Sequence, residues 1–126
     1  FTRRPHMRHF AIALALFLGL VTSAAAQEAT QVKDEATFQK LIADKQWTHS
    51  WGKTSLKLKS NGTFDGKTPK GKLKGTWYWK GKKWCRKGQL GTTILKEECQ
   101  KIYMIGNRIM KNVTNNTPKG NYYFLR

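Results

Sequence analysis

Residues 73–90 read LKGTWYWKGKKWCRKGQL and decide the fold of this chain. Apolar or aromatic side chains alternate with polar ones around Trp77 and Trp79, which is typical of a half-buried β-strand. Residues 83–90 form a second run of this kind, and Gly81 between the two favours a tight turn. The stretch therefore predicts an antiparallel hairpin.

Similar short runs fill the chain on both sides of this hairpin. Asn61-Gly62 and Gly106-Asn107 are turn signals between them. About seven short strands at this spacing predict a mainly β fold, an antiparallel meander that closes as a small calycin-like barrel or packs as a sandwich. The strands are expected over residues 53–60, 63–66, 73–80, 83–90, 97–105, 108–113 and 121–126.

One short helix is expected before the strands. Asp34 stands in the position of an N-cap, and Phe38, Leu41 and Ile42 recur at helical spacing. This pattern predicts an amphipathic helix over about residues 34–45, with its apolar side chains packed on the β-structure.

The N-terminal part resembles a secretory signal peptide. A basic start after Met7 leads into the apolar run Phe10–Val21 and then into Ala24-Ala25-Ala26. We expect translation to start at Met7, cleavage after Ala26, and a periplasmic or secreted product with no stable membrane span; an uncleaved anchor is the alternative. The expected organisation is upstream residues plus signal peptide over 1–26, a flexible leader over 27–33 and a single β domain over 34–126.

The chain is strongly basic, with 24 Lys and Arg, 7 Asp and Glu and a formal net charge of +17. Without the three arginines of the leader, 21 cations remain and the charge is near +14, mostly from lysine. Such a charge keeps a protein soluble and also suits an anionic partner. The candidate contacts for an anionic polymer or lipopolysaccharide are Lys70, Lys72, Lys74, Lys80, Lys82, Lys83, Arg86 and Lys87.

The two cysteines are expected to form a cross-strand disulfide. Cys85 and Cys99 lie at equal distances from a turn centred near Thr92, so a hairpin in this register places them opposite each other. An oxidising compartment would preserve the bond. Two cysteines with scattered histidines do not complete a metal site.

The aromatic residues of the hairpin divide into two groups. Trp77 and Trp79 share one face of their strand and are expected in the core, because so small a domain needs them there. Tyr78 and Trp84 are candidate surface contacts for a ligand. Arg86 is expected opposite Glu98 as an ion pair, with anion binding as the alternative.

Other motifs carry no chemistry. Residues 66–72 match G-x-x-x-x-G-K, but Leu73 replaces the required Ser or Thr, and the strand-to-helix setting of a P-loop is missing. No neighbouring carboxylates, free cysteine or His–Ser pair stands out. We therefore expect a protein that is not an enzyme, with no cofactor and no metal.

The motifs G-T-W-x-W at residues 75–79, Cys85-Arg86 and Cys99-Gln100 resemble a family of small exported alphaproteobacterial proteins of uncharacterised function. Members are sometimes labelled dihydrodipicolinate reductase. This sequence gives that label no support, since it has no G-x-G-x-x-G fingerprint and is too short for the two domains required.

Three functions are compatible with these features. The first is a non-enzymatic exported binding module whose basic face meets anionic envelope components or other polyanions. The second is a barrel for a small apolar ligand, and the third is an inhibitor of an envelope enzyme. The apolar cup of the second would be lined by Trp77, Trp79, Leu56 and Leu58.

Overall fold

The computed structural model describes residues 28–126, so the predicted signal peptide, its start and its cleavage site lie outside the described residues. Among residues 28–126, no helix is long and apolar enough to cross a membrane. The elements are β1 (Ala29–Val32), α2 (Glu35–Leu41), β2 (Gln46–His49), β3 (Ser55–Leu58), β4 (Thr63–Thr68), β5 (Gly71–Lys80), β6 (Lys83–Leu90), β7 (Thr93–Ile105), β8 (Ile109–Val113) and β9 (Asn121–Leu125).

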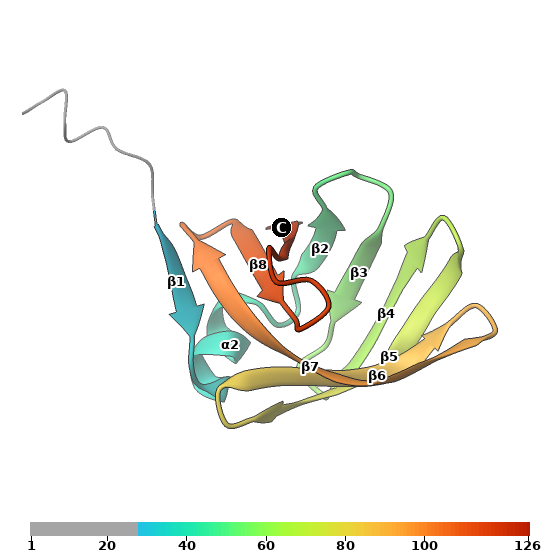
Figure 1. Cartoon of the computed structure of the whole chain (residues 1–126), viewed down its shortest axis with the longest axis horizontal. Helices are drawn as coiled ribbons and strands as arrows, with labels where there is room; N and C mark the ends of the chain where they lie inside the picture. The colour runs from blue at the N-terminus through green and yellow to red at the C-terminus, as the bar shows by residue number, and fades with distance from the viewer. Residues whose placement is uncertain (1–27) are drawn as a thin grey trace, which may run out of the picture.

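The strands form an antiparallel barrel (Figure 1). The order is β1-β7-β6-β5-β4-β3-β2-β9-β8, and an additional pairing of β7 with β8 closes the eight strands from β2 to β9 into a ring. The predicted small barrel is confirmed, and the sandwich alternative is wrong. Closure leaves these strands without a long open edge.

The prediction of a flexible leader over residues 27–33 is wrong, because Ala29–Val32 form strand β1. Ala29 pairs with Ile105, and Val32 pairs with Ile102. Strand β6 pairs with the same edge of β7, but with residues nearer its N-terminal end. Val32 is buried. The sequence did not predict this strand because its residues are mostly polar and only one apolar side chain lies on its buried face. Backbone hydrogen bonds to β7 hold the strand in place.

Helix α2 packs against one end of the barrel. The Asp34 carboxylate accepts a hydrogen bond from the backbone N–H of Thr37 at 2.8 Å, as an N-cap does. The helix ends at Leu41 rather than near residue 45. Phe38 is fully buried, and its ring centroid lies 5.2 Å from that of Trp77 and 5.3 Å from that of Trp79.

Strand β2 was not expected from the sequence. Its four residues contain one large apolar side chain, Trp47, which is buried against Trp84 inside the barrel. The strand lies between β3 and β9 in the ring. A four-residue strand with a single inward anchor shows too little alternation to be recognised.

The β6–β7 hairpin contains a β-bulge that sets the cysteine register. Leu90 faces Thr93 across a two-residue turn, a register that would place Cys85 opposite Glu98. Lys96 and Glu97 together oppose Lys87, which shifts the pairing by one residue beyond the bulge. Cys85 therefore faces Cys99 and the predicted disulfide is present, with the Cα atoms 4.0 Å apart.

Two inward glycines let strands β4 to β6 pass close together. Gly75 and Gly88 face each other across the β5–β6 ladder. A Cβ atom on Gly75 would collide with the Lys87 carbonyl oxygen and with the ring of Phe64. The barrel bends at this position because no side chain separates the strands.

Candidate functional site

A cavity of about 260 Å³ lies inside the barrel, beyond the aromatic core that packs on α2. Trp84 contacts Phe38 on the core side and also lines the cavity. The apolar part of the lining comes from Trp47 and Trp84 and from strands β3 to β7. The side chains concerned on those strands are Leu56, Phe64, Leu73, Leu90 and Leu95.

A chain of polar side chains forms another part of the lining. Arg86 Nη2 donates to Glu98 Oε1 at 3.0 Å, and Gln100 Nε2 donates to the same oxygen at 3.0 Å. Asn112 Nδ2 in turn donates to Gln100 Oε1 at 2.9 Å. Strands β6, β7 and β8 thus each contribute to one connected hydrogen-bond network.

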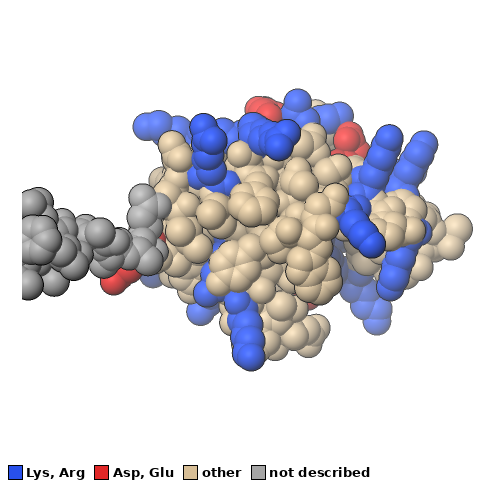
Figure 2. Space-filling view, turned by 90° about the horizontal axis from the view of Figure 1, so that it is seen from above, with Lys and Arg blue, Asp and Glu red and all other residues tan. Residues whose placement is uncertain are grey.

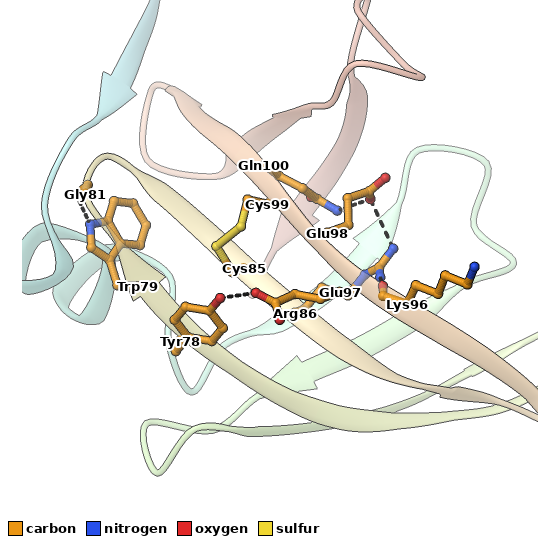
Figure 3. The surroundings of a disulfide bond; sticks show 10 residues. All are labelled: Tyr78, Trp79, Gly81, Cys85, Arg86, Lys96, Glu97, Glu98, Cys99 and Gln100. Atoms are coloured by element: carbon orange, nitrogen blue, oxygen red, sulfur yellow. Dashed lines mark hydrogen bonds and ion pairs between the residues drawn. A yellow bond between two sulfur atoms is a disulfide. The ribbon is translucent and has the colours of Figure 1, made fainter.

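Arg86 also ties this network to the bulge. Its Nη1 donates to the backbone carbonyl of Lys96 at 2.7 Å, a group that the bulge removes from the regular ladder (Figure 3). The predicted pairing of Arg86 with Glu98 is present. The alternative use of Arg86 as a surface anion contact is wrong, because its guanidinium is engaged on the inner side of the barrel.

Three buried polar atoms of the lining have no hydrogen-bond partner among the described residues. They are the indole Nε1 atoms of Trp47 and Trp84 and the Oδ1 atom of Asn112. The three side chains are 1%, 3% and 4% exposed. Each of these atoms has less than 1 Å² of accessible surface, so they lie behind the lining and do not open into the cavity.

Tyr123 completes the wall next to Trp47, with ring centroids 5.6 Å apart. Burial raises the pKa of its phenol, and the Arg86 guanidinium lowers it by a smaller amount. The phenol is therefore neutral at physiological pH.

The segment between β8 and β9 curls over the barrel interior (Figure 1). Thr114, Asn116 and Thr117 of this segment line the cavity. The segment is held by its own hydrogen bonds, including Thr117 N–H to Thr114 Oγ1 at 2.9 Å. It forms a polar cover at the mouth.

The expected apolar cup lies elsewhere than predicted. Only Leu56 of its four expected residues lines the cavity. Trp77 is buried and Trp79 partly buried against Phe38, and their indole N–H groups donate to the carbonyls of Lys59 and Gly81. Both therefore pack in or against the core, and neither lines the cavity.

The interpretation of Trp84 as a surface contact is wrong. Trp84 is 3% exposed and faces the interior. Its ladder partner is Trp79, and directly opposite residues project from the same face of a sheet. The hairpin register, applied to Trp79, would have placed Trp84 inside.

Tyr78 lies on the outer face beside the disulfide and is 41% exposed (Figure 3). Its hydroxyl donates to Glu97, a bond that raises the pKa of the phenol. Glu97 also lies near both sulfur atoms, but these sulfurs are bonded to each other and are no metal ligands.

The predicted lysines are all exposed but do not form one cluster. They divide along the ten residues of β5, which span about 30 Å. Figure 2 shows Lys and Arg side chains around the rim of one face, with few acidic groups among them. Lys80, Lys82 and Lys83 lie at the β5–β6 turn, Lys70 and Lys72 at the other end, and Lys74 and Lys87 between them.

The sequence interpretation missed three further lysines on the outer face. Lys57, Lys59 and Lys67 extend it across β3 and β4. Lys67 lies directly opposite Lys72, and Asp65 supplies one ion pair, to Lys59 at 3.1 Å. Outward alternation on these two strands was the signal that could have identified them.

Comparison with known proteins finds no matching family model, no matching curated protein and no matching solved structure.

Proposed function

We propose that this protein is a non-enzymatic barrel that binds a small molecule in the cavity at its mouth. The observation that carries the proposal is a cavity of about 260 Å³ whose aromatic and aliphatic lining borders the polar network from Arg86 to Asn112. Aromatic floors with a few placed polar groups are typical of small-ligand sites.

Binding fits the cavity better than catalysis does. Glu98 is its carboxylate, and it already accepts hydrogen bonds from Arg86 and Gln100. Among the described residues that line the cavity, no second carboxylate, His, Cys or Lys accompanies Glu98 to act with it as an acid–base or nucleophilic pair. The network therefore supports a rigid wall for a ligand.

A matched pair of phenylalanine substitutions tests this function. Leu95→Phe adds volume to the lining, whereas Ile94→Phe adds the same ring at a neighbouring, 71% exposed position. One- and two-ring compounds screened by ligand-observed NMR should bind the native protein and the Ile94 variant. The Leu95 variant should bind them at least about tenfold more weakly. Equal binding to both variants, or none to the native protein, would contradict the proposal.

A second candidate function is binding of an anionic polymer on the outer face of β3 to β6. The observation that favours it is the pair Lys67 and Lys72, like charges directly opposite each other, which destabilise a sheet unless something neutralises them. A shallow groove of about 750 Å³ runs beside Lys59, Lys74 and Lys87 on this face.

Heparin chromatography tests this second function. Reversal of both opposed lysines, Lys67→Glu with Lys72→Glu, should lower the eluting salt concentration markedly. Lys33→Glu with Lys40→Glu changes the net charge equally but acts on exposed residues at and beside α2, and should lower it little. Equal losses would mean that binding follows total charge and no particular face.

We also propose that the protein is exported. The disulfide supports a non-reducing compartment, periplasmic or extracellular. We likewise propose that it is related to the small exported alphaproteobacterial proteins that its motifs resemble.

A further inference from the structure

We infer that the mouth end of the barrel docks on an anionic membrane surface, with the Trp51 side chain entering the layer between lipid headgroups and acyl chains. The mouth end comprises the β2–β3 loop, the β4–β5 turn, the β6–β7 turn and the segment between β8 and β9. The inference rests on neither proposed function, because it needs no ligand in the cavity and no polymer on the outer face of β3 to β6.

The strand pairings place these four connections at one end of the ring. An antiparallel strand reverses direction at each turn, so alternate turns of a closed meander lie at the same end. Ser55, after the β2–β3 loop, faces Lys67, before the β4–β5 turn. A backbone N–H of the β6–β7 turn donates to the carbonyl of Lys72 at 2.8 Å, and that of Ser50 donates to the carbonyl of Tyr122 on β9 at 2.9 Å. The four connections therefore follow one another around the mouth.

Trp51 projects from this end of the molecule. It is 84% exposed, more than any other large apolar side chain that the structure describes. Its ring contacts His49 edge-on at a centroid distance of 5.3 Å, and a Cβ atom on the next residue, Gly52, would meet no atom within 4 Å. The second most exposed such side chain, Ile94 at 71%, follows the β6–β7 turn at the same end. An indole, apolar in its body and polar at its N–H, is typical of the membrane–water interface.

The charges of the mouth end are of one sign. No Asp or Glu occurs in the four stretches that form it, which are residues 49–55, 67–73, 89–95 and 113–121. Their exposed lysines are Lys53, Lys67, Lys70, Lys72 and Lys119. Neither salt bridge of the described residues uses one of these lysines. The end that carries α2 differs, because Asp34, Glu35 and Asp44 lie there among its lysines.

A membrane fits this combination better than a soluble polyanion. Each lysine close to an anionic leaflet favours binding by about fivefold, an effect that falls off within a Debye length of about 10 Å at 0.1 M salt. Lysines alone would suit either partner, but a headgroup layer also accepts an exposed indole. Single-stranded nucleic acid stacks on indoles within a charged groove, whereas Trp51 stands on a projecting loop, at the top of the view in Figure 1 and away from α2.

Quenching of tryptophan fluorescence by lipids with brominated acyl chains tests the inference on the whole chain. All five tryptophans lie in the described residues, and the four other than Trp51 are buried or partly buried. Bromine quenches an indole that enters the bilayer, so quenching of the native protein reports on Trp51. The two surfaces are vesicles of phosphatidylcholine alone and of phosphatidylcholine with about one third phosphatidylglycerol, which is anionic.

The anionic vesicles should quench the native protein strongly, and the neutral ones little, with the difference decreasing as salt rises. In cosedimentation with anionic vesicles, Trp51→Ser should weaken binding at least about tenfold. Phe124→Ser should leave binding unchanged, because Phe124 is 48% exposed but pairs with Ile109 at the other end of the ring.

A pair of charge reversals tests the lysines separately. Lys53→Glu with Lys119→Glu should weaken binding to anionic vesicles at least about 25-fold. Lys33→Glu with Lys40→Glu changes the net charge equally, but acts on exposed residues at and beside α2, and should weaken binding little. All variants carry the same residues 1–27, so differences among them arise in the barrel.

Three results would overturn the inference. They are equal quenching by neutral and anionic vesicles, equal losses in the two charge-reversed pairs, and cosedimentation without quenching. The last would mean that the lysines meet anionic groups of any source while Trp51 stays in water, as with a soluble polyanion. Quenching of the native protein decides the question even if the Trp51 variant does not fold. None of these results bears on ligand binding in the cavity, which Leu95→Phe tests separately.

Discussion

Removal of the disulfide by Cys85→Ala with Cys99→Ala should destabilise the barrel by an amount that follows from its position. The bond closes a loop with a sequence separation of 14 residues. In the chain-entropy account, a loop of this length contributes about 3 kcal/mol by restricting the unfolded chain. For a domain of this size, that corresponds to a fall in Tm of about 12–24 °C. Cys85 is fully buried, so loss of its sulfur adds about 1 kcal/mol.

Urea unfolding followed by tryptophan fluorescence measures this difference. Oxidised and reduced native protein should be compared first, because both retain the two sulfur atoms and differ only in the bond. Their unfolding free energies should differ by about 3 kcal/mol, with the double variant slightly below the reduced protein. A difference under about 1 kcal/mol would refute the reasoning, since it would mean that the β6–β7 hairpin already holds the two ends together in the unfolded chain.

Three further predictions concern other parts of the barrel. Gly75→Ala should lower stability by more than about 2 kcal/mol in thermal unfolding, because its Cβ would collide with the Lys87 carbonyl and the Phe64 ring, whereas Ala at exposed Gly52 meets no neighbouring atom and should cost only about 1 kcal/mol for its positive φ. Deletion of Lys96 should leave the Cys85–Cys99 bond intact in peptide mapping without reduction, because the remaining residues pair in the same register without a bulge; free thiols would show that the bulge is needed for curvature. Burial raises the pKa of Tyr123 in the folded state above its ordinary value of 10.0, so its stabilising contribution is complete below pH 10 and is lost as the pH rises through the folded pKa. The unfolding free energy of the native protein should therefore fall more steeply above pH 10 than that of Tyr123→Phe. Parallel pH curves for the two proteins would contradict this assignment.

The fold could be predicted where local chemistry determines structure. Gly81 adopts a positive φ of 62° in the β5–β6 turn, and Gly62 one of 91° in the turn after β3, as their glycine signals indicated. The bulge could not be predicted, because one additional residue in β7 leaves no distinct composition. The cysteine pairing was correct even though the turn lies between Gly91 and Thr92 and not on Thr92, since the bulge supplies the missing residue.

The candidate site was less accessible to sequence reasoning than the fold. Gln100 and Asn112 are polar residues on β7 and β8 that point inward, where strand patterns predict apolar side chains. Their hydrogen bond becomes visible only once β7 and β8 pair and close the ring. The cavity is a product of that closure, so no single segment indicates it.

The position of β9 has a consequence for the order of folding. Trp47 on β2 pairs with Leu125 on β9, so the ring can close only when these two strands, which are far apart in the sequence, have paired. Contacts that join distant parts of a chain form slowly, because the loop entropy is lost before the contact is gained. A chain released strand by strand from a ribosome or a translocation pore would hold β3 to β7 as an open, curved sheet until β9 emerged. The cavity therefore forms only once β9 has paired with both β2 and β8.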